Sequence, residues 1–273
     1  PYDLSLALGS GAFSPLEIVR GYAVFANGGY LVTPYYINRI DSSEGDVIFA
    51  HRPLTVCQGC ESEQQAPVSS SPASRSAAGQ DPATSEETLM EEDQGPQYAP
   101  RVITAQNAYI MRSILREVVQ RGTAVRAKAL GRNDIAGKTG TTNDQKDAWF
   151  SGFNDQVVTT AWVGFDNQKP LGSRETGGRA ALPMWIGYME EALRGSPVNL
   201  EEQPENMVMV RIDSDSGERA NENSANSRFE IFRLGMEPEE RSVGLAGSDI
   251  EVPATGSNQG GRQLEEDIAE EIF

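Results

Sequence analysis

The sequence lacks any run of about 18 apolar residues, the length that crosses a bilayer as a helix, and it shows no secretory signal peptide. Basic residues are scarce as well: 23 Lys and Arg stand against 40 Asp and Glu, which gives a formal net charge of −17 at pH 7. Such an acidic balance argues against nucleic acid as a partner, because phosphate contacts from Lys and Arg dominate that kind of binding. We therefore expect neither a membrane span within these residues nor a nucleic-acid partner.

Side chains that bind metals are also few, since the chain has one histidine, His51, and two cysteines, Cys57 and Cys60. A structural zinc site needs about four ligands, so we expect no metal and no cofactor. The Cys-Gln-Gly-Cys spacing allows a redox pair, half of a zinc site, a local disulfide, or two unreactive thiols. We favour the last two interpretations, which are a disulfide that closes a turn or two unreactive thiols.

Composition divides the chain into five regions. Residues 1–60 and 101–195 carry regularly spaced apolar residues and are expected to be globular. Residues 61–100 are rich in Ser, Ala, Pro, Glu and Gln, have almost nothing to bury, and predict a disordered insertion. We expect an extension with short strands over residues 196–239 and an acidic disordered tail over residues 240–273.

Local signals predict helices and strands inside these regions. Ser14-Pro15-Leu16-Glu17 has an N-cap serine, a proline at the first helical position and a glutamate at the third, which is typical of a helix start. Asn154-Asp155-Gln156 separates two extended apolar runs and predicts a hairpin turn. The expected elements are helices over residues 14–27, 104–121 and 183–194, and strands within residues 31–49, 147–153, 157–165, 207–212 and 229–232.

The most informative stretch is DIAGKTGTTND, residues 134–144. Gly137-Lys138-Thr139 matches the end of a phosphate-binding P-loop, but the first glycine of that motif would fall at position 132, which holds Arg132. A P-loop also leads into a helix, whereas threonines and turn formers follow here. We therefore expect a strand that ends in a loop, and no nucleotide site.

On a strand this stretch has the side chains for binding an anion. Side chains alternate between faces, so Thr139 and Thr141 would share one face and offer two hydroxyls to one carboxylate. Gly140 between them would let another element approach the backbone, and Lys138 would add a positive charge. The alternative interpretation is a solvated lysine on a threonine-rich edge strand.

Two longer stretches, LALGSGAFSPLEIVRGYAVFANGGY and RGTAVRAKALGRNDIAGKTGTTNDQKDAWFSGF, closely resemble the transpeptidase domain of class A penicillin-binding proteins, the bifunctional peptidoglycan synthases of Gram-negative bacteria. TGGRAALPMW also fits that family. The resemblance covers about residues 1–56 and 101–195. It implies an α+β fold, with a central antiparallel sheet flanked by helices, which we expect to be incomplete in this chain.

The resemblance also implies roles for individual residues. Enzymes of this family use the motifs Ser-x-x-Lys, Ser-x-Asn and Lys-Thr-Gly, and the first serine attacks a D-alanyl-D-alanine peptide bond. The catalytic candidates are Lys138, which would assist proton transfer and substrate docking, and Thr141, whose N–H would form half of the oxyanion hole. The substrate-binding candidates are Thr139, Gly140, Thr141 and Thr142, and Gly140 would let the helix of the nucleophile lie close.

The chain departs from the family pattern in one respect. It contains no Ser-x-x-Lys, and its single Ser-x-Asn, Ser224-Ala225-Asn226, lies in a polar run. In the family this motif precedes Lys-Thr-Gly, so we interpret its position here as coincidence. We expect an upstream segment of the same protein, ahead of Pro1, to carry both missing motifs, and we expect this chain alone to be inactive.

By the same resemblance, the expected partners are that upstream segment, peptidoglycan stem peptides and β-lactam antibiotics. The expected location is the periplasmic face of the inner membrane, with the anchor upstream, and the parent protein would also be a glycosyltransferase. Two alternatives stay open. One is a serine D,D-carboxypeptidase or β-lactamase-like hydrolase, which shares the Lys-Thr-Gly strand, and the other is a non-catalytic binding module with acidic arms.

Overall fold

A computed structural model describes residues 9, 11–57, 95–221, 224 and 226–239. The chain divides into two compact units, one formed by Pro1–Gly29 together with Ile103–Phe273 and the other by Tyr30–Val102. The expected disordered insertion falls largely on residues 58–94, and the expected tail on residues 240–273, and both lie outside the described residues. The five expected regions therefore stay a prediction.

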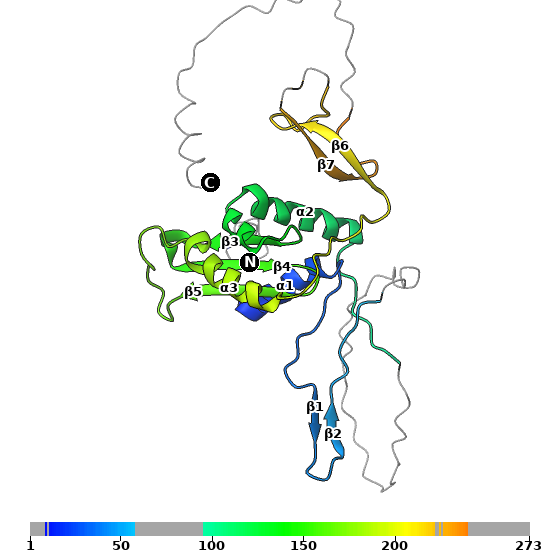
Figure 1. The fold of residues 1–273 in the computed structure, drawn as a ribbon, viewed down its shortest axis with the longest axis vertical. Helices are drawn as coiled ribbons and strands as arrows, with labels where there is room; N and C mark the ends of the chain where they lie inside the picture. Colours follow the sequence, from blue (N-terminus) through cyan, green and yellow to red (C-terminus); the bar gives the residue numbers. More distant parts are fainter. Residues whose placement is uncertain (1–8, 10, 58–94, 222–223, 225, 240–273) are drawn as a thin grey trace, which may run out of the picture. The chain divides into compact units, whose positions relative to one another are not determined.

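The first unit contains a three-stranded antiparallel sheet (Figure 1). Its strands are β3 (Ala136–Thr141), β4 (Asp147–Phe153) and β5 (Val158–Gly164), in the order β3-β4-β5. The expected turn between β4 and β5 is confirmed, because the Asn154 side-chain oxygen accepts the backbone N–H groups of Gln156 and Val157 at 3.0 and 2.8 Å. The central antiparallel sheet predicted from the sequence is confirmed as well.

Among the described residues, three α-helices accompany the sheet: α1 (Pro15–Ala26), α2 (Ala105–Arg121) and α3 (Leu182–Ala192). All three were predicted to within two residues at each end. Helix α1 begins with a full capping box, in which the Ser14 hydroxyl accepts the Glu17 N–H and the Glu17 carboxylate accepts the Ser14 N–H at 2.8 Å. This reciprocal pairing satisfies backbone donors that the first turn of a helix leaves open.

Helices and sheet bury two apolar clusters, one centred on Phe150 and the other on Phe153. These residues lie three positions apart on β4, so they point to opposite faces of the sheet. Phe150 packs edge-on against Trp185 of α3, with ring centroids 4.8 Å apart. Phe153 packs against Tyr22 of α1 and belongs to one cluster with Leu115 of α2. The sheet is therefore held between helices on both faces.

A buried ion pair fixes the chain immediately ahead of β3. Asp134 is 0% exposed and accepts the Arg132 guanidinium through two hydrogen bonds of 2.9 and 2.6 Å. Burial alone would raise the pKa of Asp134, but hydrogen bonds from Arg132 and Asn154 and the Arg132 charge outweigh it, so the pKa is lowered. Arg132 also donates to the carbonyl of Ser196 at 2.8 Å, which ties β3 to the segment after α3.

A second antiparallel pair follows in the first unit, formed by β6 (Met207–Asp213) and β7 (Ser227–Arg233). Both strands were predicted, each slightly shorter. The Gln106 side chain of α2 donates to the carbonyl of Glu205 at 3.1 Å, just before β6 begins. Of the Ser224-Ala225-Asn226 motif, Ser224 and Asn226 lie between β6 and β7 and not on the sheet that carries β3, while Ala225 lies outside the described residues.

The second unit contains a short hairpin of β1 (Arg39–Asp41) and β2 (Val47–Ala50). The strands expected within residues 31–49 are confined to β1 and β2, so residues 31–38 form no strand. Pro34 lies in the part that forms no strand, and proline has no N–H to donate to a strand ladder. Cys57 is disulfide-bonded, which agrees with the first of the two favoured interpretations, while Cys60 lies outside the described residues.

Candidate functional site

The stretch Lys138-Thr139-Gly140-Thr141 forms the C-terminal part of β3, which lies at one edge of the sheet. The strand interpretation is therefore correct, since Gly137 leads into extended backbone and not into a helix. Thr139 lies opposite Phe150 of β4, and Thr141 lies opposite Ala148. These two threonines therefore share one face of the sheet, as the alternation predicts.

The hydroxyl of Thr139 is held from two sides. Thr123, in the turn after α2, places its Oγ1 2.7 Å from Thr139 Oγ1, and either hydroxyl can donate in this pair. The Lys138 ammonium donates to the Thr139 carbonyl at 3.1 Å and lies 3.4 Å from Thr139 Oγ1. A positive charge and two hydroxyls thus gather at the centre of the strand.

The hydroxyl of Thr141 has a backbone partner from a distant part of the chain. It accepts the N–H of Gly177 at 3.0 Å, and Gly177 opens a single π-helical turn, Gly177–Ala181, that runs into α3. A hydroxyl has one proton to donate and two lone pairs to accept with. Because Gly177 occupies a lone pair, the Thr141 proton is left to be donated to a ligand.

The approach of Gly177 to β3 is close enough to require glycine. A Cβ at this position would lie 2.5 Å from the Gly140 carbonyl oxygen and would also collide with the carbonyl of Trp149. The turn is further held by Arg126, which donates to the Gly178 carbonyl at 3.3 Å. Single π-helical turns of this kind are frequent at functional sites.

The charge of Lys138 is modified by its surroundings. The residue as a whole keeps much of its surface in solvent, but neighbouring protein removes part of the hydration of the ammonium. This partial burial lowers the pKa of Lys138. A lysine of lowered pKa is better suited to exchange a proton near neutral pH.

Thr142 and Gly140, the two remaining predicted site residues, contact β4 and the connection that leads to it. The Thr142 hydroxyl accepts the Asp147 N–H at 2.8 Å and so closes the connection from β3 to β4. A Cβ on Gly140 would meet Cβ of Trp149 at 3.1 Å. Among the described residues, it is Gly177 that lies against the backbone of Gly140. The structure therefore places Lys138, Thr139 and Thr141 at one site. The Thr142 hydroxyl is instead hydrogen-bonded within the connection from β3 to β4.

Sequence reasoning missed two contributors to this site, Thr123 and Gly177. Both lie in stretches that carry the family resemblance, RGTA and TGGR. The available signal was the pair Gly177-Gly178 directly ahead of a helix, since paired glycines mark close backbone approach.

In the part of the chain that the structure describes, no cluster of three or more His, Cys, Asp or Glu is arranged to hold a metal ion. None of the helices described there is long and apolar enough to cross a membrane.

Comparison with known proteins agrees with the family resemblance seen in the sequence. Residues 3–182 match the family model described as the penicillin binding protein transpeptidase domain. Penicillin-binding protein 1A of Pseudomonas aeruginosa is 43% identical over 243 residues, which are 85% of this chain and 29% of that protein. Penicillin-binding protein 1A of Escherichia coli K12 is 35% identical over 283 residues, 90% of this chain and 33% of that protein. The chain thus spans about a third of the length of these relatives.

The fold agrees with a solved relative as well. The crystal structure of penicillin-binding protein 1A from Haemophilus influenzae superposes with a TM-score of 0.71 at 36% sequence identity, and the match covers 86% of this chain and 34% of that one. The α+β class expected from the sequence is therefore confirmed. The family match over residues 3–182, which are most of the chain, the relatives and the shared fold lead to one conclusion: this chain belongs to the penicillin-binding protein transpeptidase family.

Proposed function

We propose that this chain supplies the substrate-binding strand of a serine-type D-alanyl-D-alanine transpeptidase that cross-links peptidoglycan. The observation that carries the proposal is the arrangement on β3, where the Lys138 ammonium lies beside the Thr139 hydroxyl and the Thr141 hydroxyl keeps a free proton. One charge and two hydroxyl donors suit the terminal carboxylate of a stem peptide. The same carboxylate is present in penicillins, which would therefore bind in the same place.

The orientation of both hydroxyls supports a role in anion binding. With Thr123 as the donor to Thr139, the Thr139 proton turns away from the protein and toward the ligand. Gly177 leaves the Thr141 proton available in the same way. Hydrogen bonds from such groups to an ionised carboxylate are about 1.5–3 kcal/mol each, stronger than those between neutral groups.

The edge position of β3 supports binding of an extended peptide. In the described part of the first unit, β3 pairs with β4 on one side only. An extended stem peptide could add to the open side and form backbone hydrogen bonds there. The N–H of Thr141 is the group that the family resemblance assigns to the oxyanion hole. Lys138, Gly140 and Thr142 complete the proposed site, with Thr142 holding the connection after β3.

The nucleophile belongs, in this proposal, to a segment of the same protein that carries Ser-x-x-Lys. Its serine oxygen forms an ester with the penultimate D-alanine while the C–N bond to the terminal D-alanine breaks, and that amine leaves with a proton. An amine of a second stem peptide then attacks the ester and regenerates the serine. Lys138 would favour proton transfer by its charge and its lowered pKa.

The location follows from the substrate. We infer that the protein that carries this chain acts at the periplasmic face of the inner membrane, with an anchor outside this chain. A glycosyltransferase domain in the same protein, and binding of β-lactam antibiotics at this site, belong to the same proposal.

The test is acylation of the protein that carries this chain by a fluorescent penicillin. Lys138→Ala should lower the second-order acylation rate at least about tenfold, as loss of a charged hydrogen-bond donor implies. Lys128→Ala is the matched control, since Lys128 is an exposed lysine on the neighbouring 3-10 helix Val125–Leu130. Equal rates for both variants would contradict the proposed role of Lys138. Product analysis with stem peptides would separate cross-linking from hydrolysis to a free acid.

A further inference from the structure

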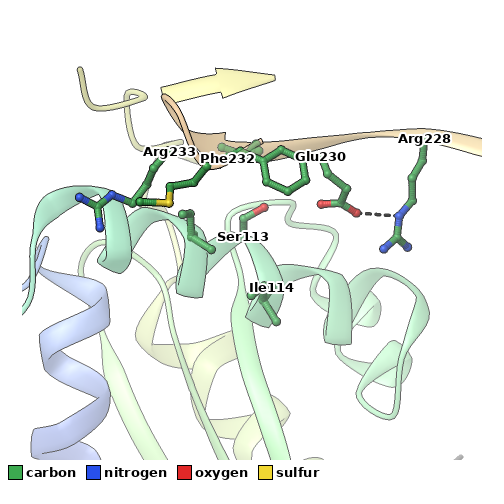
Figure 2. Close-up of a pocket in the computed structure, with 9 residues that line it drawn as sticks. Ser113, Ile114, Arg228, Glu230, Phe232 and Arg233 are labelled. Carbon is green, nitrogen blue, oxygen red and sulfur yellow. Dashed lines mark ion pairs between the residues drawn. The ribbon is translucent and has the colours of Figure 1, made fainter. Parts of the chain in front are cut away.

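A groove lies between α2 and the β6–β7 hairpin, and none of its lining residues belongs to the β3 site (Figure 2). Its volume is about 440 Å³. The apolar lining comes from two isoleucines on α2 and three residues on or just after β7: Ile110, Ile114, Ile231, Phe232 and Met236. We call this feature the α2–β7 groove.

The sequence places these side chains on one surface. Ile110 and Ile114 are four residues apart on α2 and therefore share one helix face. Ile114 is 52% exposed and Met236 is 71% exposed. Large apolar side chains left in solvent next to a hollow are typical of a surface that receives another segment.

The rim of the groove is positively charged. Arg228 and Arg233 come from β7, and Arg228 forms an ion pair with Glu230 at 2.7 Å, drawn as the dashed line in Figure 2. Two arginines against one glutamate leave a net positive rim on a chain whose overall charge is −17. An acidic, amphipathic segment has the chemistry that fits such a groove.

The C-terminal end of this chain has that composition. Residues 263–273 read QLEEDIAEEIF, with Leu264, Ile268 and Ile272 spaced four apart. On an α-helix this spacing would put the three apolar residues on one face. Five acidic residues surround them: Glu265, Glu266, Asp267, Glu270 and Glu271.

We propose that residues 263–273 dock as a helix in the α2–β7 groove of the same chain. The apolar face would lie on the isoleucines of α2 and on Phe232, and the carboxylates would face the arginines of β7. The described chain ends at Glu239, three residues after the groove residue Met236. Residues 263–273 are therefore tethered to a point close to the groove, and a tether of this kind gives an effective concentration of about millimolar, which favours this segment over one from a second molecule.

Zero-length cross-linking of the full chain tests the proposal. Arg233→Lys keeps the charge of the rim and introduces an amine that a carbodiimide couples only to a carboxylate in direct contact. We expect mass spectrometry to find this amine joined to the acidic residues between 265 and 271. Arg194→Lys is the matched control, since Arg194 is an exposed arginine on the segment after α3, outside the groove, and it should yield no link to the tail.

Tail variants separate docking from simple charge attraction. Leu264→Ser combined with Ile268→Ser leaves every carboxylate in place and alters no residue of the folded body, and it should lower the cross-link yield at least about tenfold, as loss of two buried aliphatic side chains implies. Ala269→Ser in the same segment should not lower it. A mixture of ¹⁵N-labelled and unlabelled chains should give links within single chains.

Four outcomes would overturn the proposal. These are no tail link from position 233, an equal yield from position 194, an unchanged yield in the double serine variant, or links that join labelled to unlabelled chains. The last outcome would assign the groove to the tail of a second copy. All four are independent of the transpeptidase activity, because the assay needs neither substrate nor penicillin.

Discussion

The hydroxyl of Thr123 lies 2.7 Å from the hydroxyl of Thr139 and so joins the turn after α2 to the middle of β3. Thr123 is not part of the Lys-Thr-Gly motif, yet with Thr123 as the donor in this pair the Thr139 proton points away from it. Gly177 donates its N–H to the Thr141 hydroxyl at 3.0 Å and so occupies one of its lone pairs. The proposed anion site is thus oriented by residues from two other elements.

Replacing Thr123 tests this orientation directly. Thr123→Val keeps the shape of the side chain and removes the hydroxyl, so the Thr139 proton is no longer directed outward. Acylation by penicillin should slow by about two- to tenfold, the equivalent of one net hydrogen bond. Thr123→Ser restores the hydroxyl and should restore the rate, measured by stopped-flow fluorescence. A valine variant as fast as the parent would show that Thr123 has no orienting role.

The lowered pKa of Lys138 predicts an alkaline limit to acylation. An ordinary lysine has a pKa of about 10.4, and burial lowers the pKa of Lys138, so its charge is lost at a lower pH. Because the charge attracts the substrate carboxylate, the acylation rate should fall as the pH rises through this lowered pKa. Lys138→Arg stays charged, and its residual rate should lack this limb in a pH profile. If the acylation rates of the parent and of Lys138→Arg both fell at the same alkaline pH, the fall would belong to another titrating group.

Substituting Gly177 should disrupt the site through the backbone. In Gly177→Ala the added Cβ meets the carbonyl of Gly140 at 2.5 Å, so the π-helical turn must move away from β3 and its N–H must leave Thr141. We expect acylation to fall at least about tenfold, as for an unsatisfied polar group. Gly187→Ala on α3 meets nothing within 4 Å and serves as the control. Crystallography of the alanine variant would show whether the turn has moved.

The buried pair of Arg132 and Asp134 should carry a large share of local stability. Their side chains are 10% and 0% exposed, so Asp134→Asn leaves a buried guanidinium without its counter-charge. The expected loss is about 3–5 kcal/mol in the free energy of unfolding, measured by guanidinium titration. Glu191→Gln removes an ion pair with Arg194 in which both side chains are more than two-thirds exposed, and it should cost less than about 1 kcal/mol.

The same pair predicts sensitivity to acid. The pKa of Asp134 is lower in the folded chain than the value of about 3.9 for an unfolded aspartate. Its contribution to stability is therefore fully present above about pH 4 and is lost as the pH falls through the folded pKa. The melting temperature of the parent should drop more steeply below about pH 4 than that of Asp134→Asn, which has no carboxylate to protonate there. Parallel curves would place the acid sensitivity elsewhere.

Local signals in the sequence were sufficient for most of the secondary structure. The capping box at Ser14 and the Asn154 turn depend only on residues within three positions of each other, so composition and spacing reveal them. The prediction of a strand that ends in a loop within residues 134–144 rests equally on neighbouring residues. The predicted extent of the strands in residues 31–49 was too long, because the apolar residues of that stretch were given more weight than Pro34.

The arrangement of the candidate site could not be derived in the same way. Thr141 and Gly177 are 36 residues apart, and their hydrogen bond depends on the path of the chain through β4, β5 and the following loop. Asp134 gave no sign of burial either, because a charged residue ahead of a strand is usually solvated. The resemblance to a family directs attention to β3, but the groups that contact its hydroxyls, Thr123 and Gly177, lie 16 and 36 residues away along the chain.

The second unit begins and ends at one closed junction in the first. The N–H of Ile103 donates to the carbonyl of Gly29 at 3.3 Å, and Gly29 has φ +107° with no room for a Cβ beside the Ile103 carbonyl. Closing a loop costs only about 0.6 kcal/mol more for each doubling of its length. Lengthening or shortening residues 30–102 should therefore change the entropy of closing this junction only slightly. A graft between relatives at this junction would exchange the second unit while Gly29 and Ile103 stay fixed.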